Sequence, residues 1–182
     1  YTDYSQGSVR QTGGTYDLAL SGSGFFAVSV TDKAGEVHTR YTRDGRFHLT
    51  KDGLLVDADG NAVQGQNGNI TIDPSSKNVS ISATGQITAD GELVDTLNIV
   101  DFEDYDYLKK YGDTMYEPVD GATTKDAEGE ILQGYTEQSN VNVVREMVDM
   151  ITITRAYEAS QKVIHSYDSM LDKSVNQVGA LK

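Results

Sequence analysis

Cysteine is absent from this 182-residue chain, and proline occurs only twice. Without cysteine the chain can form no disulfide, no thiol nucleophile and no thiolate zinc site. Basic residues are few as well, since 15 Lys and Arg stand against 28 Asp and Glu for a formal net charge of −13. Phosphate backbones and anionic lipid surfaces are bound by basic patches, so nucleic-acid and membrane-surface partners are disfavoured. No apolar run approaches the roughly 18 residues of a spanning helix, so membrane insertion is not expected.

Glycine and proline are distributed unevenly along the chain. Seventeen of the 18 glycines, and both prolines, lie within residues 1–134, which also carry −12 of the net charge. Residues 135–178 contain neither glycine nor proline, as a long uninterrupted helix requires. We therefore predict an extended connector over residues 1–16, a β-rich domain over residues 17–134 and a long C-terminal assembly helix over residues 135–182.

The glycine-rich part has the pattern of a hairpin meander. Short strand-like runs are separated by pairs that favour the positive φ angles of tight turns: Asp-Gly at 44–45, 52–53, 59–60, 90–91 and 120–121, and Asn-Gly at 67–68. Residues 103–130 show no clear period and are predicted to be loops, with a short helical turn over residues 108–111. The fold class expected is mainly β with a long C-terminal α-helix, in which a coiled-coil-type helix projects from a hairpin-rich β domain.

The C-terminal part has an apolar residue at every seventh position. This predicted assembly seam, with two residues at intermediate helical positions, consists of Val143, Met147, Met150, Tyr157, Ile164, Leu171, Val175 and Val178. A second apolar line comprises Val144, Val148, Ile151, Val163, Tyr167 and Met170. Repeats of seven predict a helix that supercoils with partner helices. Ser139 or Asn140 is the expected N-cap at the junction, and Gly179 the expected stop.

The expected length of this helix also indicates association. Residues 140–178 would span about 58 Å at about 1.5 Å per residue. A β domain of this size has a diameter of about 30 Å, so much of the helix is expected to project and to seek a partner. The alternative is that the helix folds back onto its own β domain. Residues 151–154 (ITIT) are the weak point of the helix, because β-branched residues are poor helix formers.

Candidate catalytic and metal-binding patterns all have simpler explanations. Residues 57–61 resemble the start of a calcium loop, but its twelfth position is Gly68 instead of an acid, so a hairpin turn is expected. Gly22-Ser23-Gly24 precedes a strand-like run and is predicted to be a turn that brings backbones close together. The three histidines, His38, His48 and His165, lack metal-ligand spacing. No catalytic constellation is found, so neither enzymatic activity nor a cofactor is expected.

Several motifs match a known family. QGYTEQSNVNV (133–143), EMVDMI (146–151), RAYEA (155–159) and DSML (168–171) resemble the C-terminal signature of bacterial flagellar rod and hook proteins. SQGS (5–8), DLA (17–19), GSGFF (22–26), YTRDG (41–45) and GLLV (53–56) are similar to the same family. Ser160 departs from the signature, where Asn is common. The compact middle region looks more like a rod protein, distal or proximal, than a hook protein.

This resemblance implies a structural subunit of the flagellar basal-body rod, located in the basal body after export to the cell envelope. Such subunits assemble into the helical axial tube that transmits torque and passes exported proteins. The partners implied are copies of the chain and neighbouring rod and hook axial proteins, with surrounding ring proteins as further candidates. The family also implies an N-terminal helix, which we expect to precede Tyr1. The alternatives are a hook-type subunit and a ligand- or carbohydrate-binding β domain with an oligomerising helix.

Overall fold

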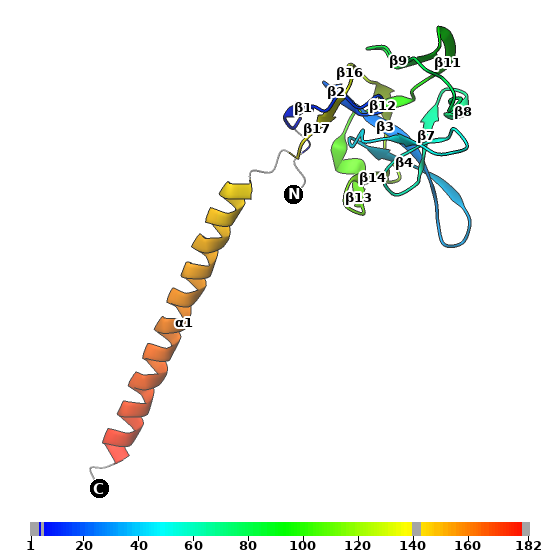
Figure 1. Ribbon diagram of the computed structural model, residues 1–182. Helices are drawn as coiled ribbons and strands as arrows, with labels where there is room; N and C mark the ends of the chain where they lie inside the picture. Colours follow the sequence, from blue (N-terminus) through cyan, green and yellow to red (C-terminus); the bar gives the residue numbers. More distant parts are fainter. Residues whose placement is uncertain (1–3, 5, 140–142, 180–182) are drawn as a thin grey trace. The chain divides into compact units, whose positions relative to one another are not determined.

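The computed structural model describes residue 4 and residues 6–139 and 143–179. The chain divides into two compact units, residues 1–140 and residues 141–182, which are described separately. The first is built from β-strands, turns and loops, and the second contains the helix α1 (Val143–Gly179) (Figure 1). The predicted fold class, mainly β with a long C-terminal helix, is confirmed.

The β unit is built from short strands. In chain order they are β1 (Val9–Gln11), β2 (Leu18–Ser21), β3 (Phe25–Thr31), β4 (Val37–Thr42), β5 (His48–Leu49), β6 (Leu55–Val56), β7 (Ala62–Gly65), β8 (Gly68–Asn69), β9 (Val79–Ile81), β10 (Gln86–Ala89), β11 (Glu92–Thr96), β12 (Ile99–Phe102), β13 (Leu108–Tyr111), β14 (Met115–Pro118), β15 (Thr124–Asp126), β16 (Glu130–Gln133) and β17 (Tyr135–Glu137). A 3₁₀ turn, η1 (Tyr105–Tyr107), lies between β12 and β13.

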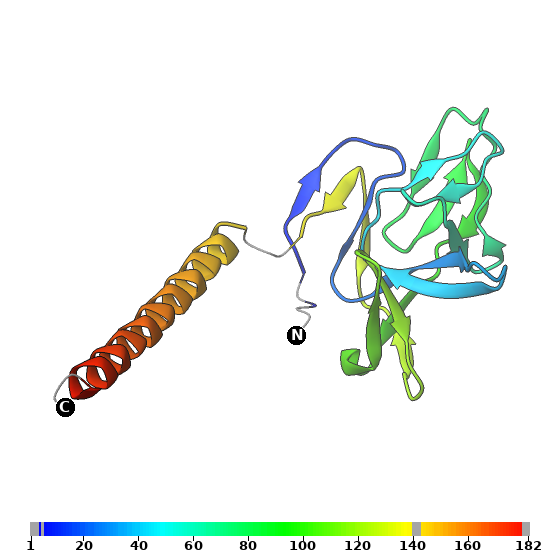
Figure 2. The ribbon, with the colours of Figure 1, turned by 90° about the horizontal axis from the view of Figure 1, so that it is seen from below.

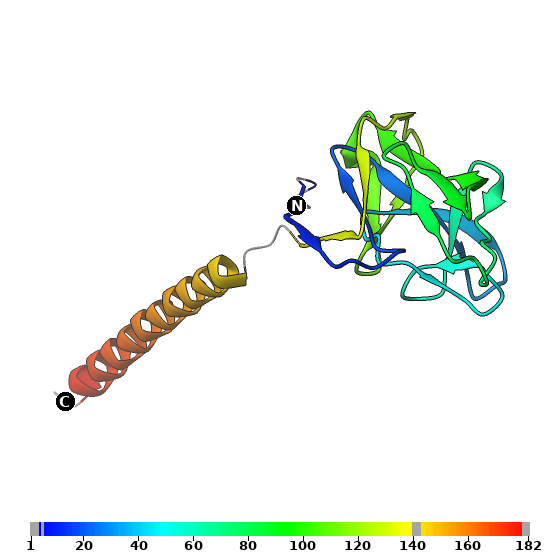
Figure 3. The same cartoon turned by 45° about the horizontal axis from the view of Figure 1, so that its top comes forward.

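Antiparallel pairing joins these strands into four sheets. The largest follows the order β13-β14-β4-β3-β7-β6-β5, with β12, β15 and β8 attached beside it, and β11-β10-β9 form a three-stranded sheet. Two small sheets connect the two ends of the unit, because β16 pairs with β2 and β17 pairs with β1. Figures 2 and 3 show β1 and β17 side by side. The segments that enter and leave the β unit are therefore held together.

The Asp-Gly pairs have two different structural roles, as tight turns and as points of close backbone approach. At residues 57–61 the predicted hairpin turn is confirmed: Asp57 Oδ1 accepts the amides of Asp59 and Asn61 at 2.9 Å each, and β6 pairs with β7. The pair at 44–45 is not a hairpin turn, because Gly45 lacks the positive φ of the other turn glycines. A Cβ on Gly45 would lie 1.9 Å from the Leu18 carbonyl oxygen. Glycine there permits a close backbone approach instead of a turn.

Two further sequence predictions need correction. Residues 103–130 are more ordered than expected, since they form η1, β13, β14 and β15, and the helical turn expected over residues 108–111 is the strand β13. Cross-strand pairing with β14 and burial of Leu108 override the weak local pattern. The helix is expected to occupy residues 135–182, but this region begins with the strand β17. Tyr135 and Thr136 favour a strand, because aromatic and β-branched residues are common in β-sheets.

The core of the β unit has two parts, on the two faces of β3. Phe26 faces the larger cluster and Phe25 the smaller, as the alternation of side chains along a strand requires. The larger cluster comprises Leu18, Leu20, Phe26, Val28, Val30, Phe47, Leu55, Val63, Ile70, Ile72, Ile81, Ile87, Leu97, Met115 and Ile131. The smaller cluster is aromatic, with the Phe25 ring 6.0 Å from Phe102, 5.7 Å from Tyr105 and 5.5 Å from Tyr116. Both faces of the central strand are thus buried.

The helix α1 has 37 residues, which corresponds to about 55 Å. It continues through residues 151–154, where Thr152 and Thr154 donate their hydroxyls to the carbonyls of Val148 and Met150 at 2.9 Å and 2.8 Å. These bonds satisfy both threonine hydroxyls within the helix. Gly179, the predicted stop, is its last residue. Among the described residues, no helix combines the length and apolar content needed to cross a bilayer.

Candidate functional site

The predicted assembly seam lies on α1. Five of its side chains are described, and their exposed fractions run from 59% to 68%: Met147, Met150, Tyr157, Ile164 and Leu171. Val143, Val175 and Val178 also belong to α1, but their side chains lie outside the described part of the chain. A side chain at every seventh residue drifts by only about 20° per heptad on a straight helix. From Met150 to Leu171 this drift adds up to about 60°, so the described seam side chains form an apolar stripe that winds slowly around the helix.

The second apolar line is exposed as well. Val148, Ile151, Val163, Tyr167 and Met170 are each more than half exposed, and Ile153 is exposed to 70%. Charged and polar residues such as Arg155, Glu158 and Lys162 separate the apolar positions. A helix that carries apolar residues on more than one side is typical of an element covered by several neighbours.

Within the β unit, the largely buried Arg43 side chain connects several segments of the chain, and this group of contacts is called the Arg43 connector. This residue follows β4, and its side chain is 17% exposed. Nε donates to Glu137 Oε2 at 2.9 Å, and Nη1 donates to the carbonyls of Gly22 and Gly24 at 3.0 Å each. Nη2 donates to the Leu20 carbonyl at 3.3 Å. The guanidinium thus ties the turn between β2 and β3 to the end of β17.

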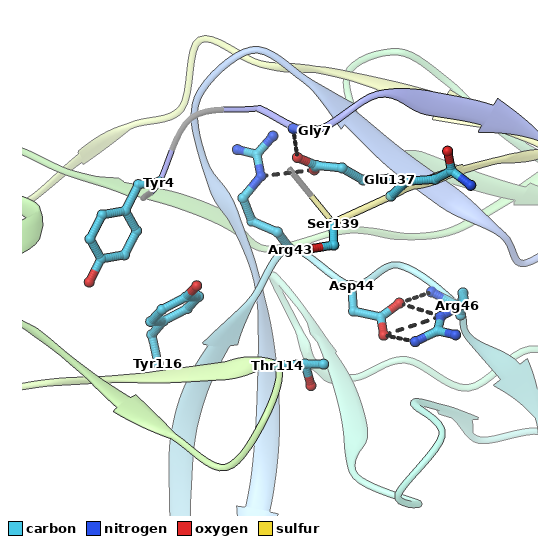
Figure 4. A pocket seen from close by; sticks show the side chains of 10 residues that line it. Tyr4, Gly7, Arg43, Asp44, Arg46, Thr114, Tyr116, Glu137 and Ser139 are labelled. Carbon is cyan, nitrogen blue, oxygen red and sulfur yellow. Dashed lines mark hydrogen bonds and ion pairs between the residues drawn. The ribbon is translucent and has the colours of Figure 1, made fainter. Parts of the chain in front are cut away.

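Glu137 is the matching acid in this connector, and its side chain is 10% exposed. Its second oxygen, Oε1, accepts the backbone amide of Gly7 at 2.8 Å (Figure 4). The next residues are joined too, because the Gln138 amide donates to the Ser8 carbonyl at 2.8 Å. The chain that enters the β unit and the chain that leaves it toward α1 are therefore fixed to one another and to Arg43.

A cleft of about 280 Å³ opens beside this connector. Figure 4 shows Tyr4 and Tyr116 on one side, and Asp44 and Arg46 on the other. Its charged residues are already paired, Arg43 with Glu137 and Arg46 with Asp44. Hydrogen bonds from Arg46 lower the pKa of the Asp44 carboxyl, although burial alone would raise it. Because these charged side chains are paired with one another, they favour a structural role for the cleft over a catalytic one.

Ser139, one of the two predicted junction residues, lines this cleft. Asn140, the other, lies outside the described residues, and α1 begins at Val143. The role of either residue as helix cap stays a prediction. Sequence reasoning missed the Arg43–Glu137 pair, because its members lie 94 positions apart and no local pattern connects them.

A second buried charge lies within the aromatic cluster. Asp101 is fully buried, with Lys125 Nζ at 3.2 Å from Oδ2 and the Tyr105 hydroxyl donating to Oδ1 at 2.8 Å. Burial opposes ionisation of this acid, but hydrogen bonds from Ser23, Tyr105 and the Phe102 amide lower its pKa overall. Burial and the bond to Asp101 raise the pKa of Tyr105 to about 12. This network fixes the position of η1 against the sheet.

Comparison with known proteins covers both units. The model of the flagellar hook protein FlgE/F/G D1 domain matches residues 19–89, and that of the flagellar basal-body rod FlgEFG protein C-terminal region matches residues 132–178. The chain is 36% identical over 183 residues to the flagellar basal-body rod protein FlgG of Buchnera aphidicola subsp. Schizaphis graminum, covering 93% of this chain and 68% of that protein. The chain belongs to the flagellar basal-body rod protein family.

Relatives from other bacteria support the same assignment. The rod protein FlgF of Caulobacter vibrioides is 34% identical over 181 residues, which cover 98% of this chain and 72% of that protein. FlgG of Bacillus subtilis is 32% identical over 194 aligned residues, which cover 96% of this chain and 70% of that protein. The resemblance to this family is confirmed, and with it a structural role in the flagellar basal body.

The matched segments contain both features described above. Arg43 lies within the D1 match, whereas Glu137, Ser139 and the whole predicted seam lie within the C-terminal match. The junction of this rod-family protein therefore brings together its two matched regions.

Proposed function

We propose that this chain is a rod subunit that self-assembles into the helical axial tube, and that the seam of α1 is its main assembly surface. The observation that carries this proposal is the row of apolar side chains on α1, each more than half exposed. In this role the subunit transmits torque and lines the path of exported proteins. It is structural, and no catalytic step is assigned to it.

The energy for assembly comes from apolar burial. Burying one of the larger seam side chains contributes about 1.5–3 kcal/mol. An isolated helix is marginal in water, because most helix stability in proteins comes from packing of its apolar face. Partner helices from copies of this chain and from neighbouring rod and hook proteins would supply that packing. Ring proteins around the rod are further candidate partners.

The β unit has a different part in the same proposal. Its residues 1–134 carry −12 of the net charge of −13, so free subunits repel one another through these units. Repeated packing of unlike surfaces, with a rotation that does not close a ring, produces an open helical assembly. The seam then drives association, and the charged β unit keeps unassembled subunits apart.

Two alternatives are less well supported. A hook-type subunit shares the D1 match, but the relatives described above are named as rod proteins. A ligand- or carbohydrate-binding β domain needs a cleft with free convergent polar groups. The charged residues of the cleft beside Arg43 are instead paired with one another.

The double variant Ile164→Asp with Leu171→Asp tests the seam. Both side chains are at least 60% exposed in α1, so the change leaves the β unit folded. Polymerisation, measured by sedimentation of the assembled fraction, should be lost. Lys162→Asp is the matched control, because it introduces Asp into the same helix and changes the net charge by the same amount. That control should still sediment, and normal polymers from the double variant would overturn the proposal.

A further inference from the structure

The tip of the β3–β4 hairpin brings together three side chains of types that can bind metal ions. His38 Nε2 lies 3.3 Å from Asp32 Oδ2 and 3.8 Å from Glu36 Oε2. One ligand atom from each of the three lies within 4.8 Å of the others. Figure 1 shows the β3–β4 hairpin extending from the β unit. Sequence reasoning dismissed His38, because the three histidines of the chain are scattered without metal-ligand spacing.

The backbone of the hairpin holds this arrangement in place. The Asp32 amide donates to the Glu36 carbonyl at 2.8 Å, and the Gly35 amide donates to the Asp32 carbonyl at 3.1 Å. Asp32 Oδ1 accepts the amides of Ala34 and Glu36 at 2.8 Å and 2.9 Å. One carboxylate oxygen is thus used to fix the turn, and the other is within hydrogen-bond distance of the His38 imidazole.

We propose that Asp32, Glu36 and His38 bind a divalent transition-metal ion of the zinc type, with an open position for water. Zn²⁺ takes imidazole nitrogen at about 2.0–2.1 Å and carboxylate oxygen at about 2.0–2.2 Å in a tetrahedral arrangement. Neighbouring ligand atoms then lie about 3.3 Å apart. The His38–Asp32 pair has this separation, whereas Glu36 Oε2 lies farther from His38, at 3.8 Å. The Glu36 side chain is 75% exposed, so it can rotate toward the other two ligands.

The imidazole distinguishes this cluster from the other acidic turns. Asp57, at the start of the calcium-like loop, uses its oxygens on the amides of residues 59 and 61 and on the Asn61 side chain. Mg²⁺ and Ca²⁺ prefer all-oxygen ligand sets, whereas imidazole suits zinc, copper and nickel. The hairpin tip should therefore prefer a transition metal to the alkaline-earth ions.

Calorimetric titration of the full chain with Zn²⁺ in excess Mg²⁺ tests the site. The wild-type chain should bind one Zn²⁺ ion. The His38→Gln variant should bind it at least about tenfold more weakly, because the loss of a residue that only supports a metal ligand already lowers metal affinity by about that factor. His48→Gln is the matched control, because His48 is an exposed histidine on another strand. Glu36→Gln provides a second test in a side chain too exposed to affect folding, and it should also weaken binding.

Two results would overturn the proposal. One is equal Zn²⁺ affinity in the wild-type chain, His38→Gln and Glu36→Gln. The other is full competition by Mg²⁺, which would show attraction to the acidic surface in general. NMR spectra of the histidine rings identify the ligand directly, because Zn²⁺ should shift the His38 resonances and leave those of His48 unchanged.

Discussion

The β unit and α1 differ in where they bury their apolar side chains. In the β unit, Phe26, Ile72 and Ile87 are completely buried within a single cluster. On α1, residues of the same chemical type, such as Ile153 and Ile164, are exposed to 70% and 60%. The first unit has the core of an independent domain, whereas the helix carries apolar surface that its own residues do not cover.

In the proposed assembly, this contrast lets one chain stay folded in its β unit while α1 provides the surface for association. The β unit draws its stability from local hairpins and from the contacts that tie its two ends together. The helix depends on packing of its apolar face, which in a rod comes from neighbouring subunits. Substitutions should therefore act in different ways in the two regions: on folding in the β unit and on assembly in α1.

The largest effect on folding is expected at the Arg43 connector. Arg43→Ala leaves Glu137 buried without its partner, which typically costs about 3–5 kcal/mol. Arg46→Ala breaks an ion pair whose arginine is 64% exposed, and should cost at most about 1 kcal/mol. Urea unfolding followed by tyrosine fluorescence measures both changes. Equal losses in the two variants would show that the connector does not stabilise the β unit.

The same substitution made in each region compares the two directly. Ile72→Ala removes a fully buried side chain and should lower the free energy of unfolding by about 2–5 kcal/mol. Ile153→Ala in the dilute, unassembled chain should change it by less than about 0.5 kcal/mol, because that side chain is 70% exposed. Urea unfolding again provides the measurement. A large decrease in the free energy of unfolding for Ile153→Ala would mean that other residues of the same chain already cover this side chain of α1.

A pH dependence of stability is expected at Tyr105. Its folded-state pKa is raised from 10.0 to about 12, so the folded state holds this proton more tightly than the unfolded state. The stabilisation is complete below about pH 10 and is lost as the pH rises toward about 12. The stability difference between the wild-type chain and Tyr105→Phe should therefore shrink over this range, as measured by unfolding at each pH. A difference independent of pH would contradict this assignment.

The sequence predicts features that depend on local patterns. The seven-residue repeat from Val143 to Val178 identifies α1, and the residues around Asp57 identify a hairpin turn. Local bonds stabilise both elements, so the pattern and the structure agree. The seam itself stays a prediction of how α1 associates.

Features that depend on distant contacts could not be predicted in this way. Gly45 looks like a turn residue but permits close approach of the Leu18 backbone, which comes from another part of the chain. The strands β13 and β17 form because β14 and β1 lie beside them. Arg43 and Glu137 meet only once the sheets are assembled. The fold class can thus be predicted from the sequence, whereas the junction requires the structure.

Amide hydrogen exchange before and after assembly tests the central claim most directly. In the dilute chain, the amides of β3 should exchange slowly and those of α1 quickly, because an uncovered helix opens easily. Once the chain has assembled, the amides of α1 should become strongly protected, while those of β3 change little. Protection of α1 that is already high in the dilute chain and does not increase on assembly would contradict the account.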